Sequence, residues 1–374
     1  MRVALVLAGP ASAPRGSQVL VRQLALGLSE RGHAVRLVTY GGERVGPPGP
    51  RLGRLVSDVR LTARLWRLVA RETIDVIHAH NYEAAIAGLV VARLTGRPLV
   101  YHGHSALAEE LPLYFASRLA CGLAARLGRF LDAQVPRRAD FCIAVTDELG
   151  ALLRRHGVMA RGLACIGPTG APDELGPPPG PAGEGGLVCY AGNLDGYQNL
   201  GFLLHAFARV RARLPGARLV LVTHAEGRAA RRLVGQTEGV EVIRARSYYE
   251  VRARLAAAAI AVCPRAERSG FPMKLLNYMA AGKAIVASAG SAKGLRDGVD
   301  ARIVADGDEA AFAGAIVELL ADAPARARLG AAARQAVEDV RAWDEVLDRV
   351  EHVYRVVLAR RAAPAGLPIL TEPS

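Results

Sequence analysis

Four of the nine histidines lie at the carboxyl ends of two short apolar runs. They are His78, His80, His102 and His104. Alternate residues of a strand share a face, so two pairs are expected side by side on neighbouring parallel strands. Three or four converging ligands would make a metal site, and nearby carboxylates could add one. We favour a polar pocket in which one histidine hydrogen-bonds a substrate, and we expect no metal.

The segment 265–282 carries a second group of chemical side chains. A loop follows an apolar run there, Pro272 suits the start of a helix, and Gly282 suits its end. Free N–H groups at a helix N-terminus attract anions, and Lys274 in the first turn adds a positive charge. A cation in that turn opposes the helix dipole, which favours a bound anion as its partner. We therefore expect an anion site at this loop.

Small residues between positions 8 and 17 join the first apolar run to a helix. Such a turn lets backbone N–H groups approach a phosphate, although a plain surface loop has the same composition. The spacing GxGxxG is absent, which excludes the usual dinucleotide fingerprint.

Short apolar runs alternate with longer helical stretches, and this pattern predicts parallel β-α-β layers. Strands are expected at 3–7, 34–39, 76–79, 99–101 and 141–145, and again at 187–190, 219–222, 240–243, 260–263 and 284–287. Helices are expected at 18–31, 308–321, 324–337 and 343–361. Open parallel sheets bind ligands at the carboxyl ends of their strands. The chemical segments should therefore meet in a cleft between two Rossmann-like halves.

Glycine and proline make up 13 of the 20 residues at 167–186, which marks a domain boundary. We predict a first domain at 1–168, a linker at 169–186 and a second domain at 187–342. A C-terminal helix at 343–361 should pack back towards the first domain. The remaining residues, 362–374, contain three prolines and are expected to form a flexible tail.

Composition excludes several classes of protein. Of the 374 residues 51% are hydrophobic, and no run is long enough to span a membrane, so a disordered or membrane-spanning chain is not expected. The net charge is +13, yet only 5% of residues are aromatic and no basic–aromatic interleaving occurs, which argues against nucleic acid. Five cysteines without a CxxC pair indicate a reducing cytoplasm.

Two further features of the charge are unusual. The three lysines, Lys274, Lys283 and Lys293, cluster in a chain that otherwise uses arginine. Arginine alternates with leucine, valine and tryptophan at 51–71, and with leucine and alanine at 119–130. Ordinary amphipathic helices packed on a sheet explain such segments, and peripheral contact with an anionic membrane leaflet is the alternative.

Together these segments resemble family-4 retaining glycosyltransferases of the GT-B fold, and the resemblance covers nearly the whole chain. The matching pieces are Gly16-Ser17-Gln18, residues 32–35, 75–80, 104–105 and 139–145, Tyr190 to Leu194, Gly270-Phe271, Asn277 to Gly282, residues 297–300 and Trp343 to Tyr354. The expected architecture is therefore α/β, with two Rossmann-like domains facing each other across a cleft.

The resemblance implies transfer of a hexosyl unit from a UDP- or GDP-sugar to a hydroxyl of a saccharide or lipid-linked acceptor. It implies no cofactor and no metal, a role in cell-surface polysaccharide or glycolipid synthesis, and a place in the cytoplasm or at the inner face of the membrane. Catalysis is assigned to His104, Lys274 and Glu267. The donor-binding residues are Gly16, Ser17, Asn193, Gln198, Ser269, Gly270, Phe271, Met273 and Asn277. The acceptor side is assigned to His80, His102 and Glu110.

The chain departs from the family pattern at four positions. Ser269 and Asn277 stand where relatives usually carry glutamate, and Asn193 and Gln198 stand where they carry a phosphate-binding arginine and lysine. Uncharged groups make hydrogen bonds about half as strong as charge-assisted ones. We predict that Glu267 supplies the missing sugar contact and that Lys274 replaces the missing cations.

Two alternatives stay open, the first of them because of these losses. One is a catalytically impaired homologue that acts as a binding or assembly subunit. The other is a sugar-nucleotide epimerase, which shares the two-domain fold.

Overall fold

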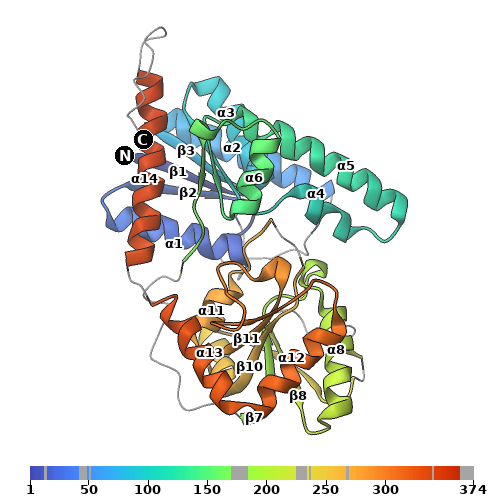
Figure 1. The fold of residues 1–374 in the computed structure, drawn as a ribbon. Coiled ribbons are helices and arrows are strands. Elements are labelled where there is room, and N and C mark those ends of the chain that lie inside the picture. The colour runs from blue at the N-terminus through green and yellow to red at the C-terminus, as the bar shows by residue number, and fades with distance from the viewer. Residues whose placement is uncertain are drawn as a thin grey trace.

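The computed structural model describes residues 1–11, 15–41, 49, 52–169, 184–224, 234–235, 237–266, 269–338 and 341–362. These residues form two domains, each with one six-stranded parallel sheet covered by helices (Figure 1). Residues 170–183 of the expected linker and 363–374 of the expected tail lie outside the described residues.

The first sheet has the order β2-β1-β3-β4-β5-β6. Its strands are β1 Arg2–Leu7, β2 Ala34–Thr39, β3 Val76–His80, β4 Leu99–Gly103, β5 Phe141–Ala144 and β6 Leu163–Cys165. Its helices are α1 Gly16–Glu30, α2 Leu52–Arg71, α3 Asn81–Thr95, α4 Leu107–Glu110, α5 Arg118–Gln134 and α6 Asp147–Arg155, with short 3₁₀ turns η1 Leu111–Tyr114, η2 Pro136–Arg138 and η3 Ala160–Gly162. The continuous apolar runs form inner strands because helices cover both faces of the sheet.

The second sheet has the order β12-β11-β10-β7-β8-β9. Its strands are β7 Glu184–Ala191, β8 Arg218–Thr223, β9 Val240–Arg244, β10 Ala258–Cys263, β11 Ala284–Ser288 and β12 Arg302–Val304. Its helical elements are η4 Gly196–Gln198, α8 Leu200–Arg213, α10 Tyr248–Ala257, α11 Lys274–Ala280, η5 Ala289–Ser291, α12 Glu309–Ala321 and α13 Ala323–Gln335. All ten expected strands are confirmed, and the short edge strands β6 and β12 were not anticipated.

The last helix, α14 Arg341–Ala362, leaves the second domain and lies beside the first (Figure 1). Asp344 at its start pairs with Arg31 after α1 at 2.8 Å, and Glu351 pairs with His33 at 3.0 Å. Its apolar side chains from Trp343 to Val357 belong to the core of the first domain. This packing brings α14 under β3, where the histidines begin.

No helix within the described ranges is long and apolar enough to cross a membrane.

Candidate active site between the two domains

The loops at the carboxyl ends of the two sheets are in direct contact. Ser269, after β10, is buried and joins three residues of the first domain. Its hydroxyl accepts a hydrogen bond from the Ala106 N–H at 2.9 Å, and its carbonyl accepts one from the Thr146 hydroxyl at 2.8 Å. Its own N–H donates to Glu109 at 3.1 Å. The structure therefore places Ser269 in the domain interface, and its assignment to the sugar stays a prediction.

Two more donor-loop residues touch the first domain. A Cβ added at Gly16, the first residue of α1, would lie only 2.9 Å from Cγ of Met273. Phe271 is half-buried and packs against the apolar cores of both domains. The structure thus brings together the start of α1 and the loop before α11, two segments that the sequence assigns to the donor.

Lys274, the first residue of α11, reaches back under the end of β7. Its Nζ donates to the Tyr190 hydroxyl at 2.8 Å and to Oε1 of Gln198, and it lies 4.1 Å from the centre of the Tyr190 ring. A Cβ added at Gly192 would be 3.0 Å from the same Nζ. Gln198 is the position at which relatives are expected to carry a lysine. The ammonium of Lys274 therefore touches the side chain that stands in for the missing cation.

Burial, together with the charge of nearby Arg265, lowers the pKa of Lys274 to about 7, although Cys263 and Asp195 act to raise it. An aromatic face and a hydroxyl stabilise the ammonium only in part. The site consequently has two cations that influence each other, Lys274 and Arg265, with the carboxyl group of Asp195 near Lys274. Such a pair suits an anion with more than one charge. The role of Arg265, whose guanidinium lies 5.1 Å from the Tyr197 ring centre, was not predicted, although it stands just beyond β10.

The other two lysines have different tasks, so their clustering in sequence does not mean a shared site. Lys283 is buried and donates to the carbonyls of Ala256 at 2.7 Å and Ala258 at 3.0 Å, which joins the end of α10 to β10. Lys293 pairs with Glu148 of the first domain at 2.6 Å and so holds the domains together.

The remaining donor-side residues line the same region without forming one cluster. Asn193 donates to the Tyr197 hydroxyl at 2.8 Å, and Asn277 on α11 accepts from the Tyr248 hydroxyl at 2.8 Å. Ser17 donates to the neighbouring Gln18 at 2.9 Å. Gly270 is buried. Glu267 lies outside the described residues, so its proposed sugar contact stays a prediction.

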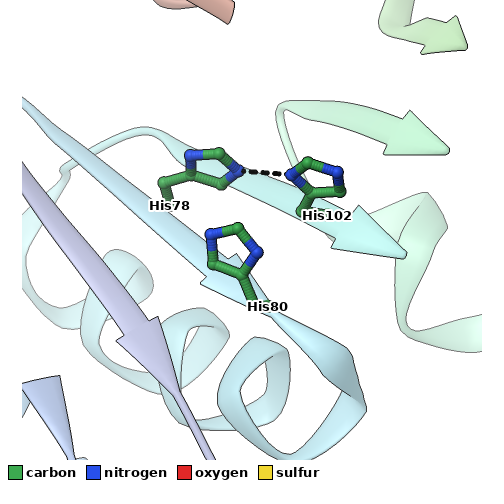
Figure 2. A group of neighbouring side chains, drawn as sticks. All are labelled: His78, His80 and His102. Carbon is green, nitrogen blue, oxygen red and sulfur yellow. Dashed lines mark hydrogen bonds between the residues drawn. The ribbon is translucent and has the colours of Figure 1, made fainter. Parts of the chain in front are cut away.

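The four histidines form a column, which we call the histidine column (His78, His80, His102 and His104). His78 Nε2 and His102 Nδ1, joined by the dashed line in Figure 2, are 3.1 Å apart, and His80 Nδ1 and His104 Nε2 are also 3.1 Å apart. The His78 and His80 rings stack with centroids 4.4 Å apart, and His102 and His104 stack at 5.0 Å. At the far end, His78 Nδ1 is 2.7 Å from the hydroxyl of Tyr354 on α14.

Burial keeps the histidine column uncharged. It lowers the pKa of His78 to about 3 and that of His104 to about 4, and it lowers the pKa values of His80 and His102 well below the usual range. A second charge among four touching rings would be repelled by the first, which adds to the effect. At neutral pH each ring therefore carries a single N–H.

His78, His80 and His102 each offer a nitrogen within 4.8 Å of the others, which is a possible metal triad. Neutral imidazoles bind zinc at about 2.0–2.1 Å through a lone pair that lies in the ring plane. Here His80 is stacked on both partners with a tilt of 29° to each, so faces rather than edges meet. The geometry favours a hydrogen-bonded column, and absence of a metal stays a prediction.

Two acceptor-side assignments need correction. His80 and His102 have 0% and 2% of their surface exposed, so they cannot line an open acceptor pocket. They lie behind His104, because the alternation of the two strands turns the rings to one face of the sheet, where His78 contacts Tyr354 of α14. Glu110 is half-buried and accepts hydrogen bonds from Ser105 at 2.7 Å and Tyr114 at 2.9 Å. Its acceptor role stays a prediction.

Comparison with known proteins agrees with this architecture. Residues 14–169 match the family described as Glycosyltransferase Family 4, and residues 185–322 match the one described as Glycosyl transferases group 1. The two regions correspond to the two domains, except that strand β1 lies before the first region, and they include both sides of the contact between the domains. The chain therefore belongs to the family-4 glycosyltransferases and has their GT-B fold.

Curated relatives extend along nearly the whole chain. A phosphatidyl-myo-inositol mannosyltransferase of Mycobacterium leprae is 27% identical over 383 residues, which cover 96% of this chain and 97% of that protein. An alpha-maltose-1-phosphate synthase of Mycobacterium tuberculosis is 27% identical over 398 residues, covering 96% of this chain and all of that protein.

Solved structures share the fold. A sucrose-phosphate synthase from Thermosynechococcus elongatus superposes with a TM-score of 0.80 at 20% identity, covering 96% of this chain and 99% of that one. Anabaena HepE in complex with UDP and glucose superposes with a TM-score of 0.71 at 17% identity, covering 95% of this chain and 100% of that one.

Proposed function

We propose that this protein is a metal-independent retaining glycosyltransferase that moves a hexosyl unit from a UDP- or GDP-sugar to an acceptor hydroxyl. The observation that carries the proposal is the contact between the Lys274 ammonium and the Gln198 side chain. It puts a cation into the space beside the position of the missing family lysine, so the diphosphate still meets a positive charge. Buried Arg265 adds a second one.

The reaction needs this charge most when the donor breaks. The bond between the sugar C1 and the diphosphate oxygen breaks, and a new C1–O bond to the acceptor forms on the same face of the ring. The acceptor proton passes to the departing phosphate oxygen. Negative charge grows on the diphosphate as the sugar becomes oxocarbenium-like, so fixed cations lower the barrier. In this scheme His104 lies beside the transferred sugar, and Gly16 lets backbone N–H groups of α1 approach the phosphates.

The acceptor that we propose is a lipid-linked or saccharide hydroxyl at the inner face of the cell membrane. Support comes from relatives named for phosphatidyl-myo-inositol and D-inositol 3-phosphate. It also comes from α5, where Leu119, Leu123, Leu127 and Phe130 recur on one exposed face. The arginines of α5 are exposed as well, whereas its acid, Asp132, is buried. An apolar stripe flanked by cations suits an anionic lipid surface.

The test is to remove the positive charge of Lys274 and then to place a lysine at position 198 instead. Lys274→Met keeps the length of the side chain but removes the charge, and nucleotide affinity should fall about 10–100-fold, the scale of a lost charge-assisted hydrogen bond. Adding Gln198→Lys to this variant should restore most of the affinity and the rate of donor hydrolysis. Affinity is measured by calorimetric titration with UDP, GDP and their sugars.

Arg302→Met is the matched control, because it also removes one positive charge. Arg302 pairs with Glu318 at 2.9 Å on the edge strand β12. This control should bind nucleotide like the wild type. Unchanged affinity in Lys274→Met would refute the role of Lys274. Absence of both nucleotide binding and hydrolysis in the wild type would favour the impaired homologue, and release of an epimerised nucleotide sugar would favour the epimerase.

A further inference from the structure

Two nitrogens of the histidine column are buried without a hydrogen-bond partner among the described residues. They are Nε2 of His80 and Nε2 of His102. Each of these rings uses its other nitrogen, Nδ1, in a contact of 3.1 Å, with His104 and His78 respectively. His80 on β3 and His102 on β4 are paired in register. Both rings therefore show the same pattern, with Nδ1 in contact and Nε2 without a partner.

The lack of partners at these two nitrogens indicates which ring nitrogens of the histidine column are protonated. A neutral imidazole has one N–H and one lone pair. A buried donor or acceptor without a partner costs a desolvation penalty of about 1–3 kcal/mol. Among backbone groups, orphaned N–H groups are rarer than under-used acceptors. By the same preference, we assign a lone pair to the unpartnered Nε2 atoms of His80 and His102. Both rings consequently carry their proton on Nδ1, which faces the neighbouring histidine.

We propose that His80 is the positioning residue for His104: it donates its Nδ1–H to Nε2 of His104 and so fixes the tautomer of His104 with the proton on Nδ1. His104 is half-buried where the domains meet, so this proton is the one that it offers to the substrate. The inference deepens the proposed function and rests on it for the role of His104. An N–H there can donate to the departing oxygen, whereas a lone pair could only accept from a sugar hydroxyl.

The second chain of hydrogen bonds runs in the opposite direction, away from the substrate. His102 donates from Nδ1 to Nε2 of His78, which leaves the His78 proton on Nδ1 facing the oxygen of Tyr354 at 2.7 Å. The two hydrogen-bonded pairs, His80–His104 and His102–His78, contact each other through stacked ring faces rather than through hydrogen bonds. A change at His102 therefore disturbs packing beside His104 without removing its proton donor.

The first measurement is the tautomer itself. Long-range ¹⁵N–¹H correlation spectra of the full-length, ¹⁵N-labelled protein at pH 7 separate protonated from unprotonated ring nitrogens, and a His104→Gln spectrum assigns the signals. We expect Nδ1 of His104 to carry the proton. A proton on Nε2 of His104 in the wild type would overturn the proposal.

Variants then test the cause. His80→Asn keeps an N–H near the Nδ1 position and should preserve the tautomer, whereas His80→Leu should shift His104 towards the Nε2–H form. The same His80→Leu variant should lose about tenfold in kcat, the scale of one hydrogen bond, with little change in the KM for donor. His102→Leu is the packing control and should keep the wild-type tautomer.

The outcomes separate this inference from the proposed function. An unchanged His104 tautomer in His80→Leu would refute the positioning role, whatever the activity. Loss of the Nδ1–H form in His102→Leu as well as in His80→Leu would show a packing effect and would also refute it. If the wild type shows the expected tautomer but transfers no sugar, the proposed function fails and the hydrogen-bond assignment stands.

Discussion

At the scale of single residues, the site depends on a lysine whose charge is only weakly stabilised. The lowered pKa of Lys274, about 7, means that half of the free protein carries the ammonium at that pH. A bound diphosphate favours the charged form, so binding above pH 7 requires uptake of a proton. If Lys274 contacts the donor diphosphate as we propose, donor affinity should be highest below pH 7 and fall as the pH rises.

This lysine gives a pH-dependent prediction. In the wild type, kcat/KM for the donor should decrease about tenfold for each pH unit above 7, because this ratio reports the free enzyme. Lys274→Arg keeps a charge throughout this range. Its kcat/KM should therefore not decrease above pH 7, even if the rate is lower at every pH. Steady-state kinetics from pH 6 to 9 provide the measurement. Identical pH profiles of kcat/KM for the two proteins would assign the decrease above pH 7 to another titrating group.

At the scale of elements, glycines decide how closely helices approach. A Cβ at Gly128 of α5 would lie 2.5 Å from the backbone nitrogen of Ala108 on α4, whereas nothing lies within 4 Å of the corresponding position at Gly122. Asp132, also on α5, accepts hydrogen bonds from the N–H groups of Leu107 at 2.9 Å and Ala108 at 3.0 Å. The close contact at Gly128 therefore holds α4, and with it Glu110, in place.

Two alanine substitutions in α5 should have opposite effects. Gly122→Ala should stabilise the protein by up to about 1 kcal/mol, since alanine favours the helix and has room. Gly128→Ala should destabilise it by about 1–3 kcal/mol, because the backbone of α4 has to move. Urea unfolding measures both free energies. Equal changes in the free energy of unfolding would show that the packing of α4 against α5 does not depend on the close contact at Gly128.

At the scale of the whole molecule, the two domains are joined by polar contacts on both sides of the site. Ser269 ties the donor loop to the first domain, Lys293 pairs with Glu148, and α14 returns to the first domain. The exposed face of α5 belongs to the first domain, so membrane contact would hold that domain while the second carries the nucleotide.

Membrane contact can be tested with matched surface variants. Leu119 and Phe130 are 78% and 61% exposed on α5, and Tyr249, in the second domain, is 79% exposed. The double variant Leu119→Ser, Phe130→Ser should sediment less with vesicles rich in phosphatidylglycerol at low salt, because apolar insertion and charge act together. Tyr249→Ser should sediment like the wild type. A wild type that stays in the supernatant, or three equal bound fractions, would refute the membrane surface.

Much of the architecture follows from local pattern. Continuous apolar runs predict inner parallel strands, and Gly282, with φ of 59°, follows the end of α11 as expected. Gly32, with φ of 83°, follows the end of α1 in the same way. Strands β6 and β12 were missed because three residues give too short a pattern to separate from a loop. Their pairing is set by neighbours that are distant in sequence.

The sequence by itself determined the two parallel sheets, the family resemblance, and the positions where two cations and two glutamates are missing. It could do so because strand and helix periodicity and turn residues act over a few neighbours. Only the tertiary structure decided that Lys274 reaches Gln198, that Lys283 and Lys293 serve the core and the interface, and that His80 lies behind His104. Those outcomes depend on burial and side-chain direction across elements up to 276 residues apart, as in the contact of His78 with Tyr354, and no local pattern encodes them.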